Sequence, residues 1–72
     1  MDLDNYKSIV AENIKDARLR AGLSQEELAQ KLNAHVPQIS RWESGKHSID
    51  LYTAFWLSRV LNVSMDKLFG GK

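Results

Sequence analysis

The 72-residue sequence contains no cysteine and only one proline. The absence of cysteine excludes disulfides and thiolate metal ligands, and nothing ties the protein to an oxidising compartment. No apolar run approaches the roughly 20 residues that span a bilayer. The N-terminal stretch MDLDNYK is acidic where a secretory signal is basic. We therefore expect a cytoplasmic protein that neither inserts into a membrane nor is exported.

An excess of charge is also lacking, because the formal net charge is only +1. Any surface that binds nucleic acid must therefore come from the local placement of lysine and arginine. The hydrophobic content of 43% and the charged content of 26% are ordinary for a folded chain. A chain of this length forms at most one domain with a small core, so residues 1–72 are expected to be a single domain.

Patterns typical of catalytic and metal sites are missing as well. His35 and His47 are twelve positions apart at opposite ends of one expected helix, which is not a metal-ligand spacing. No carboxylate cluster completes a metal site, and there is neither a Gly-rich phosphate loop nor a nucleophile elbow. We therefore expect no enzyme, no metal ion and no other cofactor.

Strand patterns are absent, whereas apolar residues recur at helical spacing from end to end. The first helix is expected from about Asn5 to Arg20, and Gly22 ends it. Its inward-facing residues are Ile14, Ala17 and either Ile9 or Val10. A fourth helix follows an Asp50 cap and a short fifth follows a Ser64 cap. The residues that these two helices are expected to bury are Leu51, Ala54, Leu57, Ser58 and Leu61 in the fourth and Met65, Leu68 and Phe69 in the fifth.

Two short helices in the middle form a unit of about residues 24–45. The second helix begins after Ser24, whose hydroxyl forms a capping box with Glu27, and it buries Leu28, Ala29 and Leu32. A tight turn follows at Asn33 to His35, because asparagine tolerates the left-handed conformation. The third helix begins at Val36 or Pro37, where proline is harmless, and ends at Gly45. The unit has helix-turn-helix dimensions, and the whole chain is expected to be all-α, a compact bundle of five helices.

The third helix has an inward and an outward side. At 100° per residue, Ile39 and Trp42 share the inward side, and Glu43 lies close beside them. A half-buried carboxylate needs a partner, and the fork of Arg18 in the first helix can bind it in two places. The alternative is that Arg18 and Glu43 are both solvated. The outward side gathers Pro37, Ser40, Arg41 and Ser44, with Val36 and Gln38 on its flanks.

The stretch GLSQEELAQKLNAHVPQISRWESGK resembles the signature of the helix-turn-helix family of phage repressors and Cro proteins, often called the Xre family. The resemblance continues through LNVSMDKLF and covers about residues 9–69. It implies a five-helix bundle that binds double-stranded DNA, with the second helix over the backbone and the third in the major groove. It also implies the pair of Arg18 with Glu43.

The resemblance assigns DNA contacts position by position. Its base-reading positions correspond to Val36, Pro37, Gln38, Ser40 and Arg41. The sequence departs from the family here, because Pro37 can donate no hydrogen bond and Val36 offers only apolar contact. We interpret Arg41 as a reader of guanine and Gln38 as a reader of adenine, with Val36 selecting thymine. Arg41 could instead clamp a phosphate, and Gln38 could cap the helix. The phosphate contacts that the resemblance implies are Ser24, Gln25, Ser44, Lys46 and His47.

Phe55 and Trp56 in the fourth helix fall at the margin of its inward face or outside it, which suggests a dimer interface, although Phe55 could instead fill the core. Members of the family usually bind as two-fold dimers. The expected function is therefore sequence-specific DNA binding by a small homodimeric regulator of bacterial or phage origin, acting as a repressor. The alternative is a protein-interaction module, such as the antitoxin that binds a toxin partner.

Overall fold

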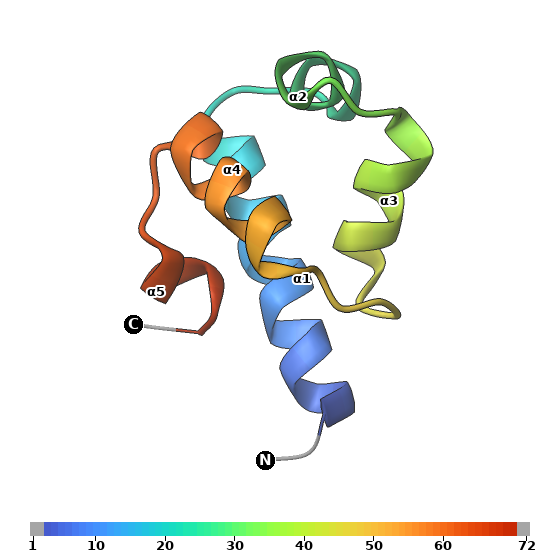
Figure 1. Cartoon of the computed structure of the whole chain (residues 1–72), viewed down its shortest axis with the longest axis vertical. Helices are drawn as coiled ribbons and strands as arrows, with labels where there is room; N and C mark the ends of the chain where they lie inside the picture. Colours follow the sequence, from blue (N-terminus) through green and yellow to red (C-terminus); the bar gives the residue numbers. More distant parts are fainter. Residues whose placement is uncertain (1–2, 71–72) are drawn as a thin grey trace.

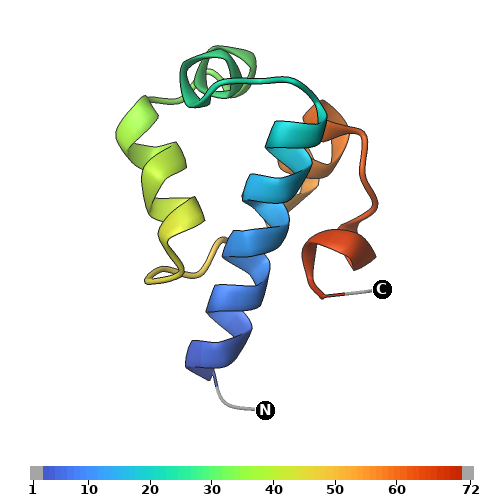
Figure 2. The ribbon, with the colours of Figure 1, turned by 180° about the vertical axis from the view of Figure 1, so that it is seen from behind.

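The computed structural model describes residues 3–70, which form five helices. The helices are α1 (Leu3–Arg20), α2 (Gln25–Leu32), α3 (Val36–Ser44), α4 (Leu51–Leu61) and α5 (Met65–Leu68). The predicted all-α bundle is confirmed, and α1 begins two residues earlier than expected. In Figure 1, α4 lies in front of α1, with α3 on one side and α5 on the other. The view from behind in Figure 2 shows the long α1 between α3 and α5, and α2 crossing above them.

The helix ends follow the capping residues of the sequence. Ser24 Oγ accepts a bond from the Glu27 N–H (3.0 Å), and Glu27 Oε1 accepts one from the Ser24 N–H (2.9 Å), which completes the capping box. Asp50 Oδ1 accepts a bond from the Thr53 N–H (2.7 Å) at the start of α4. Asn33 has φ 53° at the end of α2, so the chain turns there directly into α3.

The core draws a fully buried side chain from each helix, namely Ile14, Leu28, Ile39, Leu57 and Leu68. All five helices therefore share one core. Displacing any one of them would leave a cavity in that core and so destabilise the packing of the other four. The aromatic ring of Tyr6 in α1 stacks on Phe69 after α5, with ring centroids 6.2 Å apart. This contact ties the C-terminal end of the described chain back to α1.

The expectation that Leu51 is buried was wrong, because its side chain is 73% exposed. The buried stripe of α4 is Ala54, Leu57, Ser58 and Leu61, and Leu51 lies about 70° from the centre of that stripe at 100° per residue. It also occupies the first position of the helix, where no following turn covers it. Met65 in α5 is half-buried rather than buried.

Candidate nucleic-acid interface

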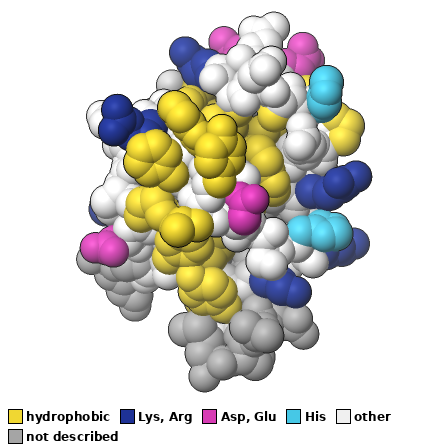
Figure 3. Space-filling view, viewed as in Figure 1, with side chains coloured by type: hydrophobic (Ala, Val, Ile, Leu, Met, Phe, Trp, Pro, Cys, Tyr) yellow, Lys and Arg dark blue, Asp and Glu magenta, His cyan; other side chains and the backbone are white. Residues whose placement is uncertain are grey.

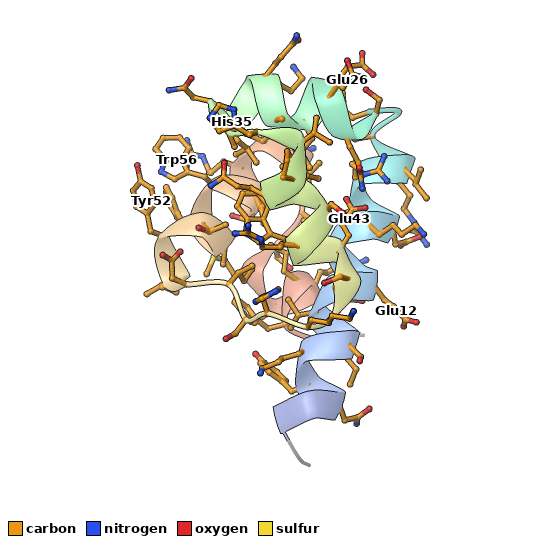
Figure 4. All side chains as sticks on the ribbon, turned by 90° about the vertical axis from the view of Figure 1, so that its right-hand side faces the viewer. Glu12, Glu26, His35, Glu43, Tyr52 and Trp56 are labelled. Carbon is orange, nitrogen blue, oxygen red and sulfur yellow. The ribbon has the colours of Figure 1, made fainter. Side chains whose placement is uncertain are left out.

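α3 is fixed to the core along one side and open to solvent along the other. Ile39 is fully buried, and Trp42 is half-buried against the core. The exposed residues of the helix are Pro37, Gln38, Ser40, Arg41 and Ser44. Figure 4 looks onto this helix, which lies across the front of the molecule. The outward side predicted from the helical spacing is thus the exposed side in the structure.

A buried ion pair holds α3 to α1. Arg18 Nε donates to Glu43 Oε2 at 2.6 Å, and Arg18 Nη2 donates to Glu43 Oε1 at 3.1 Å. The two side chains are only 9% and 5% exposed. Arg18 Nη1 also donates to the Leu23 carbonyl at 2.8 Å, so the guanidinium holds the loop before α2 as well. The arrangement expected from the sequence is therefore present, and the solvated alternative is not.

Gln25 joins the same network, a contact that sequence reasoning missed. Its Nε2 donates to Glu43 Oε1 at 3.2 Å, so the first residue of α2 is tied to α3. A side-chain amide has two N–H donors and one oxygen acceptor, so this bond leaves capacity for a phosphate. The spacing of Gln25 and Glu43 gave no signal for the contact, because it depends on how α2 crosses α3.

Val36 and Gln38 differ from the other residues of the outward side. Val36 is half-buried and packs against the core, so only part of its surface is open to a ligand. Gln38 Oε1 accepts a bond from the His35 N–H at 2.9 Å, which is the capping role left open by the sequence. The capping bond uses the amide oxygen and leaves the amide N–H donors for another partner.

The loop after α3 is organised by Ser44. Its Oγ donates to the Arg41 carbonyl at 2.8 Å and accepts a bond from the Lys46 N–H at 3.3 Å. The hydroxyl proton of Ser44 is therefore used within the protein, which reduces what Ser44 can offer to a phosphate. Lys46 and His47 are exposed beyond it, and in Figure 3 one of the two histidines lies among lysine and arginine side chains on the α3 side.

The start of α2 carries two acidic side chains, whose negative charge disfavours binding of a phosphate there. Hydrogen bonds from the Ser24 backbone, and next from its side chain, lower the pKa of the Glu27 carboxyl group. Glu27 and Glu26 both lie in the first turn, where negative charge offsets the partial positive charge of a helix N-terminus. A phosphate near this helix start would therefore have to be bound by the Ser24 hydroxyl proton and the remaining N–H groups of Gln25, since the Ser24 N–H already donates to Glu27.

Phe55 and Trp56 are 45% and 43% exposed, which excludes complete burial of Phe55 in the core. Tyr52 is 72% exposed and lies on the same face of α4, together with Leu51. Sequence reasoning missed these last two, although their i, i+1, i+4, i+5 spacing with Phe55 and Trp56 could have revealed a second apolar face. In Figure 3 a continuous hydrophobic surface, drawn in yellow, covers the region where α4 lies in Figure 1.

Within residues 3–70, no helix is long and apolar enough to cross a membrane. The same part of the chain holds no group of three or more His, Cys, Asp or Glu side chains placed to bind a metal ion.

Known proteins resemble this chain over most of its length. A profile of the helix-turn-helix family matches residues 14–68. The HTH-type transcriptional regulator ImmR of Bacillus subtilis is 38% identical over 61 residues, covering 85% of this chain and 48% of ImmR. The control protein C.SmaI of Serratia marcescens is 37% identical over 64 residues, covering 89% of this chain and 76% of that protein.

Some relatives are considerably longer than this chain. The HTH-type transcriptional activator BcrR of Enterococcus faecalis is 33% identical over 61 residues, and the chain covers only 30% of its length. The chain thus spans half or less of both ImmR and BcrR.

A solved structure has the same fold. The crystal structure of a hypothetical transcription factor, NHTF from Neisseria, aligns with a TM-score of 0.83 and 26% identity, over 96% of this chain and 79% of that chain. The profile match, the relatives and the shared fold agree with the motif in residues 24–45. The chain therefore belongs to the helix-turn-helix family of the Xre and Cro type, a family of transcriptional regulators rather than of enzymes.

Proposed function

We propose that this chain binds double-stranded DNA by inserting α3 into the major groove and that it regulates transcription from the bound site. The observation that carries the proposal is the exposed polar side of a helix whose other side is fixed by Ile39 and by the pair of Arg18 with Glu43. A rigidly held helix can present side chains to base edges at low entropic cost. DNA lies in the bacterial cytoplasm, where we expect the protein to act.

Within α3, Arg41 is the proposed reader of guanine, because a guanidinium can donate to guanine O6 and N7 together. Gln38 is the proposed reader of adenine through its amide N–H donor, although its oxygen is already bonded to His35. Ser40 and Pro37 line the same exposed side, and the exposed part of Val36 can contact a thymine methyl.

Phosphate contacts are proposed from Lys46 and His47 after α3 and from Ser24 and Gln25 at the start of α2. Ser44 is the weakest of the phosphate candidates, since its hydroxyl already donates within the protein. Two copies of the chain are proposed to occupy two half-sites about one helical turn apart, roughly 34 Å. A regulator of this kind represses when its site overlaps a promoter, and we propose that role.

The test is selection from a random duplex pool at moderate salt, followed by sequencing of the retained DNA. We expect an inverted repeat, and we expect Arg41→Ala to lose about 1–3 kcal/mol of discrimination at a guanine position. Arg20→Ala, which removes an exposed arginine from α1, is the matched control and should retain the motif. Salt-sensitive binding without any enriched motif would contradict base reading and direct the search to a protein partner such as a toxin.

A further inference from the structure

A cavity of about 290 Å³ lies where α2, α3 and α4 meet. Three aromatic side chains line it, Trp42 from α3 and both Tyr52 and Trp56 from α4. Figure 4 shows Tyr52 and Trp56 projecting from α4 at the edge of the molecule. The lining includes none of the residues that we propose to contact DNA, so an occupant of this cavity would be a further partner of the domain.

The aromatic walls of the cavity are held in place before any ligand binds. Trp42 is half-buried and packs against the core. The Trp56 ring meets the Phe55 ring edge to face at 5.5 Å and the Tyr52 ring at 6.3 Å between centroids. Rings ordered beforehand lose little further freedom on binding. They also offer flat apolar surfaces on which another aromatic ring can stack.

The charge of the cavity selects the kind of ligand. Lys31 is the only charged side chain among the described residues that line it. Lys31 takes part in neither ion pair of residues 3–70, which involve Arg18 and Arg20 instead. Glu27, one turn earlier in α2, uses a carboxylate oxygen to cap that helix. The Lys31 ammonium can therefore pair with a bound carboxylate, whereas it would repel the quaternary ammonium ions that aromatic cages also bind.

The size of the cavity suits a ligand with one or two rings. A cavity of about 150 Å³ holds one benzene molecule, so 290 Å³ has room for a bicyclic ring with a short carboxylate arm. The side-chain amide of Asn33 and the hydroxyl of Thr53 also line the cavity. Both groups can donate hydrogen bonds to a carboxylate beside Lys31.

We propose that this cavity binds a small planar aromatic carboxylate, with its ring against the three aromatic side chains and its carboxylate at Lys31. Because Tyr52 is 72% exposed, the bound ligand stays partly open to water, and we expect a dissociation constant on the order of 0.1–1 mM. The inference goes beyond the proposed function, since binding of this ligand requires no DNA. Loss of one activity therefore leaves the other in place.

The first experiment adds indole-3-acetate to the isotope-labelled full chain and follows the indole N–H signals by NMR. The chain has two tryptophans, Trp42 and Trp56, and both line the cavity. Both signals should therefore shift with one dissociation constant. Tryptamine carries the same ring with a positive charge and should bind at least fivefold more weakly, because Lys31 repels it.

Three results of this titration would overturn the proposal. The first is the absence of any shift at millimolar indole-3-acetate. The second is equal binding of indole-3-acetate and tryptamine, which would mean that Lys31 does not select the charge of the ligand. The third is a pair of signals that move with protein concentration and not with ligand, which would show that a second copy covers the cavity.

A pair of lysine variants tests the carboxylate contact. Lys31→Gln removes the positive charge from the cavity and should weaken binding of indole-3-acetate at least threefold without weakening that of tryptamine. Lys15→Gln makes the same change at an exposed lysine of α1 that does not line the cavity, so both affinities should stay as they are. Equal effects of the two variants would reject the contact with Lys31.

A pair of α4 variants tests the position of the ring. Tyr52→Ala removes one aromatic wall and should weaken binding of indole-3-acetate at least threefold. Leu51→Ala changes the adjacent residue, which is 73% exposed and lies outside the lining, and should leave the affinity unchanged. Both side chains are largely exposed, so the fold should tolerate either change. Equal affinities of the two variants would place the ligand elsewhere. Failure of the DNA selection with normal binding of indole-3-acetate would instead reject the proposed function alone.

Discussion

At the scale of single residues, Glu43 connects three parts of the molecule. It lies in α3, and its two oxygens accept hydrogen bonds from Arg18 in α1 and from Gln25 in α2. The neighbouring Arg41 and Ser44 are exposed, so the helix turns from core to solvent within one turn. The position of the outward side of α3 therefore depends on the carboxylate of Glu43, which itself faces inward.

Replacement of Glu43 by glutamine should destabilise the protein by about 3 kcal/mol, because it leaves the buried guanidinium of Arg18 without its counter-charge. Urea unfolding monitored by circular dichroism measures this loss. Since the loss approaches the whole stability of so small a domain, Gln25→Ala serves as a milder variant, with an expected loss of about 1 kcal/mol.

Arg20→Ala provides the control for this series. It breaks the exposed ion pair of Arg20 with Asp16. An exposed i, i+4 pair on a helix stabilises a protein by only about 0.3–0.5 kcal/mol. A loss for Glu43→Gln as small as that of Arg20→Ala would mean that the buried pair does not stabilise the fold.

At the scale of helices, the helix ends that are capped by a nearby residue could be predicted from the sequence. Ser24, Asn33 and Asp50 each form caps that depend on a few neighbouring residues, and the structure has them where the sequence indicated. The bond of Gln25 to Glu43 could not be predicted, since it depends on how α2 crosses α3. The exposure of Leu51 was predicted wrongly, because Leu51 lies away from the centre of the buried stripe and at the first position of α4. The outward side of α3 followed from helical spacing, but the half-burial of Val36 depends on packing against the core.

Gln38 allows capping of α3 to be separated from DNA recognition. Gln38→Glu keeps an acceptor for the His35 N–H and places negative charge at a helix N-terminus, so stability should stay equal or rise slightly. The same change puts a carboxylate against the duplex and removes the amide donor, so affinity for the selected DNA should fall at least tenfold. Thermal melts and fluorescence anisotropy measure the two effects.

The matched variant Gln38→Ala removes the capping bond and should cost about 0.5–1 kcal/mol of stability. Unchanged DNA affinity in both variants would show that Gln38 caps the helix and does not contact DNA. Equal losses of stability in both would show instead that the bond to His35 contributes nothing.

At the scale of the whole molecule, the net charge of +1 gives no general attraction to DNA. Binding must rely on where the positive side chains lie. Lys46 and Arg41 are exposed in and after α3, whereas the start of α2 carries Glu26 and Glu27. The resulting contact with phosphates is small for each copy, so the proposed binding of two copies to one duplex would supply both affinity and the spacing between half-sites.

The dependence of affinity on salt measures how many phosphates this arrangement contacts. Each neutralised phosphate contributes about 0.9 to the slope of log affinity against log salt concentration. Lys46→Ala removes one proposed contact from each copy, so on an inverted repeat the slope should become shallower by about 1.8. The sequence preference should stay unchanged, because a phosphate contact carries no base information.

Lys67→Ala is the control. It removes the same charge from α5, on the side of the bundle away from α3, and should leave the slope as it is. An unchanged slope in Lys46→Ala would remove Lys46 from the interface, and a change near 0.9 would mean that only one copy contacts the duplex through this residue.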